Sequence, residues 1–266
     1  MRAHGQHEEA ISAFRSAYER LVAGESAYVA SADLEPAGDV ESLEELPDAD
    51  PATALADVVV VKLNGGLATT MGLRAPKSLV DAREGHSFLD IIVGQIRALR
   101  RRHGIRLPLV LMDSEATREQ TLATLPADAS GGVEPDFMQS VVPKLDAERL
   151  EPISWPPNPA LEWAPPGHGD VYGALRRSGT LGTLLEQGFR YAMVSNADNL
   201  GATVDARIAS LVAAQRIPFL MEVVVGTVAD RKGGHIARRL ADGQLVLRET
   251  AQTPPEDEES FRDYRR

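Results

Sequence analysis

A run of β-branched residues at positions 57–63, DVVVVKL, constrains the fold of this chain more than any other segment. The four consecutive valines at 58–61 are typical of a strand that is buried on both faces. From this strand onward, strand patterns alternate with helical patterns as far as residue 249. Such alternation indicates a parallel-rich sheet with helices on both faces. Ligands of such sheets bind at the carboxyl ends of the strands.

The periodicity of apolar residues predicts the individual elements. We expect strands at 57–63, 107–112, 133–139, 190–195 and 218–227, helices at 88–103, 115–125, 170–188 and 204–215, and a two-stranded hairpin at 236–249. Ser114 is expected to cap the second of these helices, and the third should break near Gly179. Asp242-Gly243 supplies the hairpin turn.

The residues before this alternation have a different character. Residues 7–30 carry apolar side chains at helical spacing and predict an amphipathic helix. Residues 31–56 are acidic and contain three prolines, which indicates a solvated surface connection. A length of 266 residues allows one large α/β domain or two modest ones. We therefore expect an N-terminal helix and acidic connection at 1–56, followed by an α/β domain at 57–266.

Composition restricts the chemistry and the partners. The absence of cysteine excludes a disulfide scaffold, a thiolate metal site and a cysteine nucleophile. The formal net charge of −11 argues against a nucleic-acid or anionic-membrane surface. The apolar stretches are too short to span a bilayer, and no signal peptide is visible after residues 1–7. We expect a soluble, cytoplasmic protein without nucleic-acid or membrane partners.

A glycine-rich segment, LNGGLATTMG at 63–72, follows the buried strand directly, with Pro76-Lys77 close behind. Paired glycines let backbone N–H groups approach an anion, and Lys77 can place a cation against phosphate oxygens. The segment is not a P-loop, because Pro76 stands where that motif needs glycine. It is not a dinucleotide fingerprint either, because Ala68 and Met71 occupy two glycine positions. The competing interpretation is an ordinary structural turn.

Two further segments contain residues that could bind ligands. SNADNLG at 195–201 follows a predicted strand, and a short carboxylate such as Asp198 at that place can hold Mg²⁺ beside phosphates. Alternatively, Asp198 or Asn199 caps the helix that begins near residue 204. PPGHGDVY at 165–172 contains His168, which could donate a hydrogen bond to a phosphate or hydroxyl, or could simply lie in a loop.

The motifs together resemble one family. LNGGLATTMGLRAPK, FMQSVVPKL, PPGHGDVY, SNADNLGA, ADRKGGHI and LRETAQ occur in this order between about residue 57 and residue 252, and they are similar to the UTP–glucose-1-phosphate uridylyltransferase family. Only four of the 28 basic residues are lysines, and all four fall within these motifs or directly beside them. The resemblance implies a Rossmann-like nucleotidyltransferase fold, with a mixed, mostly parallel central sheet and helices on both faces. Residues 57–266 would then form the UTP-binding catalytic domain.

The resemblance also implies roles for particular residues. Lys77 would be catalytic and lie on the phosphates, and Asp198 would hold Mg²⁺ as the cofactor. The remaining binding residues implied for UTP are Leu63, Asn64, Gly65, Gly66, Gln139 and Gly167, of which Gln139 and Gly167 would read uracil. Those implied for the sugar phosphate are His168, Asn196, Gly234 and Glu249.

The sequence departs from the family pattern at several places. Ala68 stands where the general nucleotidyltransferase pattern has glycine, and His235 stands where the family usually has threonine. If residue 68 had a left-handed backbone, alanine would cost about 1 kcal/mol there. Family members continue past residue 266 with a second catalytic lysine, so we expect a domain that is incomplete at its C-terminal end.

The implied partners are UTP and glucose 1-phosphate, and the implied products are UDP-glucose and pyrophosphate. Two alternatives stay open at this point. The first is a uridylyltransferase for another sugar 1-phosphate. The second is a truncated, non-catalytic module that binds UTP or a UDP-sugar.

Overall fold

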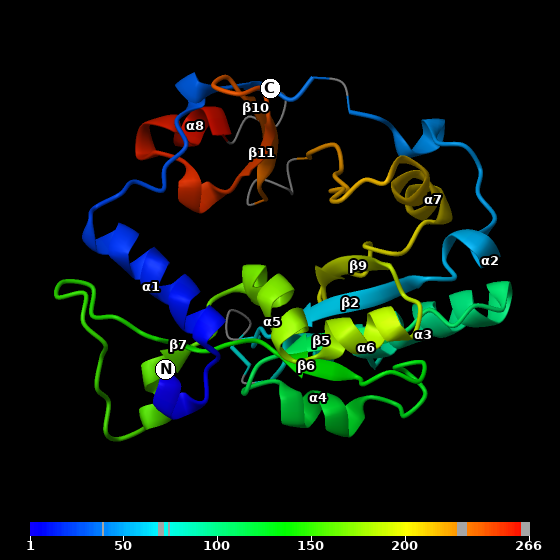
Figure 1. Cartoon of the computed structure of the whole chain (residues 1–266), viewed down its shortest axis with the longest axis horizontal. Helices are drawn as coiled ribbons and strands as arrows, with labels where there is room; N and C mark the ends of the chain where they lie inside the picture. The colour runs from blue at the N-terminus through cyan, green and yellow to red at the C-terminus, as the bar shows by residue number, and fades with distance from the viewer. Residues whose placement is uncertain (39, 69–71, 74, 228–232, 262–266) are drawn as a thin grey trace. The chain divides into compact units, whose positions relative to one another are not determined.

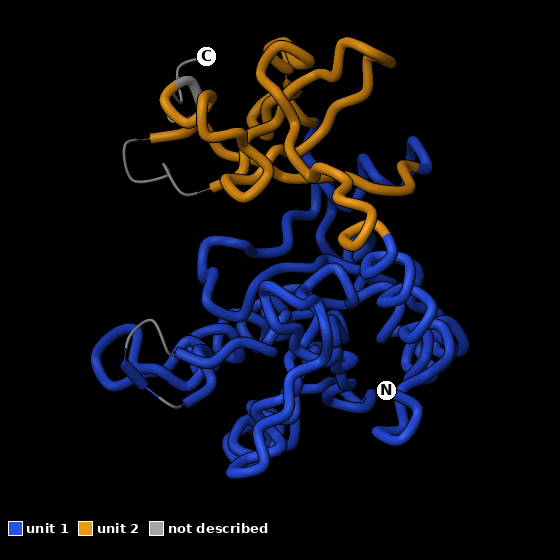
Figure 2. The backbone as a smooth tube through the Cα atoms, turned by 90° about the vertical axis from the view of Figure 1, so that its left-hand side faces the viewer, with its two compact units in different colours: residues 1–19, 47–216 blue, residues 20–46, 217–266 orange. Residues whose placement is uncertain are grey.

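The computed structural model of the protein describes residues 1–38, 40–68, 72–73, 75–227 and 233–261, with the backbone alone at 260–261. Contacts divide the chain into two compact units, coloured separately in Figure 2. Unit 1 consists of residues 1–19 and 47–216, and unit 2 of residues 20–46 and 217–266. This grouping differs from the expected division at residue 56, because part of the acidic segment pairs with a strand near the C-terminus. In the described part of the chain, no helix has the length and apolarity needed to cross a membrane.

The helices and strands of the described residues are labelled in Figure 1 where space allows. The helices are α1 Glu8–Val22, α2 Pro51–Ala54, α3 Phe88–His103, α4 Arg118–Thr124, α5 Val171–Arg177, α6 Thr180–Glu186, α7 Ala206–Gln215 and α8 Glu258–Phe261. The strands are β1 Leu34–Pro36, β2 Val58–Asn64, β3 Asp81–Arg83, β4 His86–Ser87, β5 Leu109–Asp113, β6 Asp136–Met138, β7 Val142–Pro143, β8 Trp163–Ala164, β9 Tyr191–Asn196, β10 His235–Arg239 and β11 Leu245–Arg248.

The central sheet of unit 1 has four strands in the order β6-β5-β2-β9. All three pairings between its neighbouring strands are parallel. The chain adds β5 and then β6 on one side of β2, and afterwards adds β9 on the other side. The order of strands therefore reverses between β2 and β9, which is where open α/β sheets bind their ligands.

Strand β2 is buried on both faces, as its run of valines predicts. Val58 and Val60 pack with α3 in one core, to which α7 contributes partly buried alanines. Val59 and Val61 pack in a second core with α5 and α6. The α/β fold with helices on both faces of a parallel sheet is thereby confirmed, and Figure 1 shows β2 lying centrally among these elements.

Unit 2 contains a three-stranded antiparallel sheet in the order β1-β10-β11. The hairpin predicted around Asp242-Gly243 is confirmed, with His235 opposite Arg248 and Gly243 at φ 69°. Strand β1 lies in the segment that the sequence predicted as a solvated connection, and it pairs with β10. Arg248 is buried and donates to the carbonyl of Val29 at 3.1 Å, which also ties residues preceding β1 to this sheet.

Three sequence predictions about elements are wrong. The segment 218–227 forms no strand in the described residues, and Val224 and Val225 are 80% and 92% exposed. A β-branched run forms a strand only where a neighbouring strand takes up its hydrogen bonds, and no described strand pairs with this one. Helix α1 ends at Val22, well before residue 30, because Gly24 with φ 69° follows its last turn.

The third error concerns Ser114, which does not cap a helix. Residues 114–117 form a turn in which the Ser114 amide donates to Thr117 Oγ1 at 3.0 Å, and α4 begins only after this turn. The hydroxyl of Ser114 instead donates to the carbonyl of Gly65 at 3.0 Å. Ser114 therefore supports the glycine-rich segment.

Candidate functional site

The glycine-rich segment leaves the carboxyl end of β2 and returns to it. Asn64 is the last residue of β2, and the chain comes back through an antiparallel bridge between Leu67 and Pro76. The amide of Lys77 then donates to the carbonyl of Gly66 at 3.0 Å. These contacts close the segment into a loop that places Lys77 beside the end of β2. Residues 69–71 of the motif lie outside the described residues.

The side chain of Lys77 reaches the turn that follows β9. Its Nζ donates to Asp198 Oδ2 at 3.3 Å, and the two side chains are 38% and 36% exposed. Asp198 stands in this place because the pairing of β2 with β9 continues past the strand, where Ala197 N donates to the Leu63 carbonyl at 3.1 Å. The structure thus brings together Lys77 and Asp198 at the reversal of strand order.

Neither Asp198 nor Asn199 caps α7. The N-cap of that helix is Asp205, whose Oδ1 accepts from Arg207 N at 2.8 Å. Asn199 Oδ1 accepts from the amides of Gly201 and Ala202, so it stabilises the turn itself. The capping alternative is therefore wrong, and the Asp198 carboxylate points toward the lysine of the glycine-rich segment.

Gln139 lies against the first glycine of this segment. A Cβ added to Gly65 would stand 2.0 Å from Gln139 Nε2, so only glycine allows this approach. Gln139 is 6% exposed, and its Oε1 is buried with no hydrogen-bond partner among the described residues. Because its side-chain amide has an acceptor without a partner and an N–H donor of its own, Gln139 can pair with the polar edge of a planar base.

Gly167 begins the turn that carries His168. Its φ of 114° and ψ of 171° lie in a region that only glycine adopts readily. The short helix His168–Asp170 follows, and Gly167 and His168 are both exposed. This geometry leaves the backbone of Gly167 and the imidazole of His168 accessible to a ligand.

An ion pair that the sequence does not predict connects this turn to Ser140, the residue after Gln139. Asp170 accepts from Arg177 Nη2 at 2.6 Å and from Ser140 N at 2.6 Å, and the side chains of the pair are only 11–12% exposed. Gly173 permits the contact, because a Cβ there would stand 2.2 Å from Arg177 Nη1. The pair therefore contacts Ser140, which follows Gln139, and Asp170 N also donates to the Gly167 carbonyl at 3.2 Å. The sequence signal was limited to an Asp and an Arg seven positions apart.

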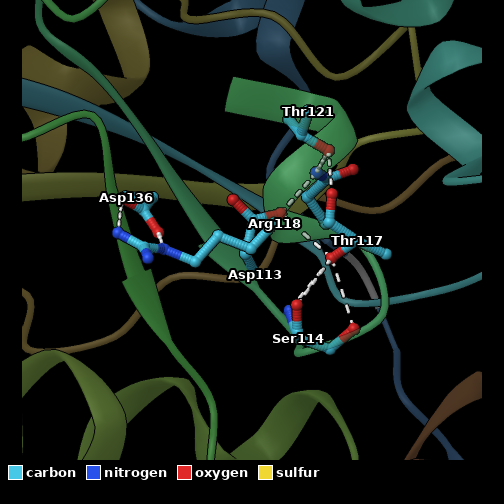
Figure 3. A network of polar contacts seen from close by, with 7 residues as sticks. Asp113, Ser114, Thr117, Arg118, Thr121 and Asp136 are labelled. Atoms are coloured by element: carbon cyan, nitrogen blue, oxygen red, sulfur yellow. Dashed lines mark hydrogen bonds and ion pairs between the residues drawn. The ribbon is translucent and has the colours of Figure 1, made fainter. Parts of the chain in front are cut away.

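Asn64 takes part in a buried polar network rather than facing a ligand with its amide nitrogen. Its Nδ2 donates to Asp113 Oδ1 at 2.6 Å and to Thr121 Oγ1 at 2.9 Å. Thr117 Oγ1 also donates to Asp113 Oδ1, at 3.1 Å, and Figure 3 shows Asp113 between these threonines with the Arg118–Asp136 pair alongside.

Burial raises the pKa of Asp113 to about 6, although the hydrogen bonds from Asn64 and Thr117 act in the opposite direction. Asp113 Oδ2 and Asn64 Oδ1 are buried with no hydrogen-bond partner among the described residues. The network joins the ends of β2 and β5 to α4. It therefore fixes the backbone from which the glycine-rich segment departs.

The residues predicted for the sugar phosphate fall in both units. His168 and Asn196 belong to unit 1, and Asn196 is exposed at the end of β9. Gly234 and Glu249 belong to unit 2, where they meet: a Cβ on Gly234 would stand 2.9 Å from Glu249 Oε1. The Glu249 carboxylate also caps the short helix Thr250–Gln252. Lys232 of the same motif lies outside the described residues.

The two departures from the family pattern cause no backbone strain. Ala68 is fully buried and does not have a positive φ, so the cost considered for a left-handed alanine does not arise. His235 is the first residue of β10, opposite Arg248 in the hairpin.

The residues that could hold a metal are few. Within the described ranges, no three His, Asp or Glu side chains gather in a way that could hold a metal ion. A single carboxylate at Asp198 nevertheless fits Mg²⁺, which is usually held by one or two carboxylates together with substrate phosphates and water. The Lys77 ammonium beside Asp198 marks the same place as one where phosphates can bind.

The fold and the site together define a class. A parallel sheet whose order reverses between β2 and β9, with a glycine-rich segment, a lysine and a carboxylate at that point, is typical of an α/β nucleotide-binding protein. Comparison with known proteins identifies the particular family. The sequence profile of the UTP–glucose-1-phosphate uridylyltransferase family matches residues 11–266, and the chain belongs to this family.

Individual relatives agree with this assignment. The chain is 41% identical over 218 residues to the UTP–glucose-1-phosphate uridylyltransferase of Hordeum vulgare, covering 81% of this chain and 46% of that protein. It is 42% identical over 214 residues to a probable UTP–glucose-1-phosphate uridylyltransferase of Schizosaccharomyces pombe, covering 80% and 42%. The chain therefore spans about half the length of the relatives it matches.

Solved structures give the same result for the fold. A mutant UDP-glucose pyrophosphorylase from Leishmania major in complex with UDP-glucose aligns with a TM-score of 0.90 at 41% identity, over 100% of this chain and 58% of that chain. A protein from Trypanosoma brucei described as UDP-glucose phosphorylase aligns with a TM-score of 0.92 at 38% identity, over 99% and 57%. The predicted nucleotidyltransferase-type fold is confirmed.

Proposed function

We propose that this chain carries the UTP site of an enzyme that transfers a uridylyl group from UTP to glucose 1-phosphate, giving UDP-glucose and pyrophosphate. The observation that carries the proposal is the pairing of Lys77 with Asp198 at 3.3 Å, at the reversal of strand order and beside the glycine-rich segment. A cation and a carboxylate side by side can receive a phosphate chain and its metal ion. Membership of the uridylyltransferase family supports UTP as the nucleotide.

The proposed roles follow the positions of the residues. Gln139, with its free acceptor, and the backbone of Gly167 read uracil, and the Asp170–Arg177 pair joins the segments that contain them. Lys77 binds the phosphates. The residues proposed to surround the uridine and its phosphates are Leu63, Asn64, Gly65 and Gly66, and those proposed for the sugar phosphate are His168, Asn196, Gly234 and Glu249. Residues 57–266 are the proposed catalytic domain, and residues 1–56 are its N-terminal extension.

The reaction needs charge stabilisation more than proton transfer. An oxygen of the sugar phosphate attacks the α-phosphorus and forms a new P–O bond, while the bond to the oxygen that bridges toward the β-phosphorus breaks. Pyrophosphate leaves with that electron pair. Because the attacking oxygen is already anionic at neutral pH, no general base is required. Preorganised cationic and amide donors then supply the catalysis, as in other transfers at phosphorus.

Asp198 is the proposed ligand of Mg²⁺. When bound there, the ion would neutralise charge on the phosphates. The part of the chain in this role is to present a carboxylate oxygen of Asp198 beside the Lys77 ammonium. The position of Asp198 at the carboxyl end of β9 supports this role.

Calorimetry with UTP and ATP at matched Mg²⁺ concentrations tests which nucleotide binds. Release of pyrophosphate in the presence of glucose 1-phosphate tests whether the chain transfers the uridylyl group. We expect UTP to bind at least tenfold more tightly than ATP, because Gln139 can match the edge of uracil. Equal affinities, or tighter binding of ATP, would contradict the assignment. Parallel assays with other sugar 1-phosphates identify the acceptor.

A further inference from the structure

A buried lysine occupies the middle of the central strand, outside the predicted binding residues. Lys62 is only 2% exposed and lies between Val61 and Leu63 in β2. Burying an ammonium is costly unless its donors are used. Burial lowers the pKa of Lys62 to about 8, and no described carboxylate offsets that effect. Packing alone does not explain a buried ammonium at this position.

The ammonium of Lys62 contacts both ends of the turn that carries Asp198. Its Nζ donates to Ser195 Oγ at 2.7 Å and to the carbonyl of Ala202 at 3.0 Å. Ser195 stands directly before the turn 196–201 and Ala202 directly after it. Parallel pairing places Ser195 opposite Lys62 in the sheet, whereas Ala202 lies beyond the turn. One side chain of the central strand therefore joins the entry and the exit of this turn.

The polar residues of the turn, Asn196, Asp198 and Asn199, are exposed, whereas Ala197 is buried. Within the turn, Asn199 Oδ1 accepts from two backbone amides, and Gln95 Nε2 donates to the Leu200 carbonyl at 3.2 Å on the inner side. The bonds to Asn199 Oδ1 fix the shape of the turn, and Gln95 ties it to α3. Ala197 N, which donates to the Leu63 carbonyl at 3.1 Å, ties the first part of the turn to β2, and the bond from Lys62 to Ala202 adds a tie from β2 to its far end.

We propose that Lys62 is a positioning residue, which holds the turn 196–201 by both ends and so sets where the carboxylate of Asp198 stands relative to Lys77. Charge-assisted hydrogen bonds from an ammonium are short and strong, and one nitrogen can serve two acceptors at once. An apolar side chain could fill the same volume but could not join the two ends. Lys62→Met removes a buried charge and two hydrogen bonds at once, and these changes act in opposite directions on stability, so positioning is measured separately from stability.

Hydrogen exchange tests the positioning directly and needs no ligand. In Lys62→Met we expect the amides of residues 199–203 to exchange at least fivefold faster, while β2, β5 and α3 keep their protection. Lys144→Met is the matched control, because Lys144 is exposed, and it should leave the exchange of these amides unchanged. Unchanged exchange at 199–203 in Lys62→Met, or a rise of the same size throughout unit 1, would overturn the proposal.

Ser195→Ala provides a second variant, in case Lys62→Met does not fold. It removes one acceptor and leaves the lysine in place, so exchange at 199–203 should rise at least twofold. If these amides exchange at the wild-type rate in Ser195→Ala, the bond from Lys62 to Ser195 does not hold the first end of the turn.

The consequence for Asp198 rests on the proposed function and is measured separately. The affinity for UTP is determined for the wild type and Lys62→Met, once with Mg²⁺ and once with EDTA. We expect the gain in affinity that Mg²⁺ gives to fall at least fivefold in the variant, while the affinity in EDTA stays within twofold. If the wild type does not bind UTP, the proposed function fails, and the exchange experiment still decides on Lys62. If exchange rises but the Mg²⁺-dependent gain is unchanged, the turn does not position the metal ligand and the proposal is wrong.

Discussion

The Lys77 ammonium and the Asp198 carboxylate lie 3.3 Å apart, each more than a third exposed. Exposed pairs of this kind contribute only about 0–1 kcal/mol to stability. Each side chain can therefore exchange its partner at little cost. Under the proposed function, phosphate oxygens would take the place of Asp198 at the lysine, and a divalent cation would take the place of Lys77 at the carboxylate.

Replacing Lys77 by alanine should weaken the binding of UTP and leave the fold intact. A hydrogen bond to a charged group contributes about 1.5–3 kcal/mol, which corresponds to a loss of roughly 10- to 100-fold in affinity. The melting temperature should stay within a few degrees of the wild type, because the pair with Asp198 is partly exposed. Calorimetry with UTP measures the effect, and Lys144→Ala serves as the exposed control. An affinity within threefold of the wild type would show that Lys77 does not contact the bound UTP.

Asp198→Asn should remove the dependence of UTP binding on Mg²⁺. The change is nearly isosteric, and Asp198 does not cap α7, so no helix loses its N-cap. Only the charge that a hard divalent ion requires disappears. Titration of UTP with and without Mg²⁺ gives the comparison. A sharp drop in melting temperature with an unchanged effect of Mg²⁺ would show that the carboxylate is structural.

Gly65→Ala tests whether the place of Gln139 determines the choice of nucleotide. The new Cβ would stand 2.0 Å from Gln139 Nε2, so the end of this flexible side chain must move. Gly65 does not have a positive φ, and no backbone strain adds to the effect. We expect the preference for UTP over ATP to fall by about tenfold, with a stability loss below about 1–2 kcal/mol. A preserved preference would exclude Gln139 as the residue that reads the base.

Local signals explain which elements the sequence predicts correctly. Helix α3 was predicted at its observed ends because both ends carry their own signals. The Ser87 hydroxyl accepts from the amide of Asp90 while Asp90 accepts from the amide of Ser87, and Gly104 with φ 66° ends the helix. The segment 218–227 has strand composition, but a strand also requires a partner, and nothing in the local sequence reports one.

For the candidate site too, the sequence predicts what local signals determine. Motifs identify the segments that contain Gly65, Lys77 and Asp198, because each is a short pattern after a strand. The supporting contacts are not local: Lys62 meets Ser195 across 133 positions, and Asn64 meets Asp113 across 49. Such contacts depend on the order of strands in the sheet, which periodicity alone does not determine.

The Asp170–Arg177 pair should show strong energetic coupling, unlike an exposed pair. Asp170→Asn leaves a guanidinium 11% exposed without its charge partner, and we expect a loss of about 3–5 kcal/mol. The double variant with Arg177→Met should lose less than the sum of the single losses, by about 1–3 kcal/mol. Urea unfolding of the four proteins measures the cycle. The same cycle on Asp146 and Arg149, an exposed pair, should give below about 1 kcal/mol. Equal coupling in both cycles would contradict the structural role of the buried pair.

Asp113 should make the stability of the fold depend on pH in an unusual direction. Burial raises the pKa of this carboxyl to about 6, whereas in an unfolded chain it is about 3.9. Between these values the folded protein binds more protons than the unfolded chain. The contribution of Asp113 to the free energy of unfolding therefore decreases as pH rises from about 4 to about 6. Above pH 6 the raised pKa lowers the free energy of unfolding by its full amount, about 3 kcal/mol.

Asp113→Asn should remove this dependence and make the protein more stable at neutral and alkaline pH. The amide stays neutral, and its Oδ1 can still accept from Asn64 Nδ2 and Thr117 Oγ1, as the carboxylate does. Near pH 4, where the wild-type carboxyl is protonated in the folded state, the two proteins should have similar free energies of unfolding. By pH 8 the variant should be more stable by up to about 3 kcal/mol, because it buries no charge there. Urea unfolding at several pH values between 4 and 8 gives both curves. Glu115→Gln, an exposed carboxylate two residues further on, controls for the loss of one negative charge and should show no such divergence. If the difference between Asp113→Asn and the wild type does not change between pH 4 and pH 8, the pKa of Asp113 is not raised in the folded state.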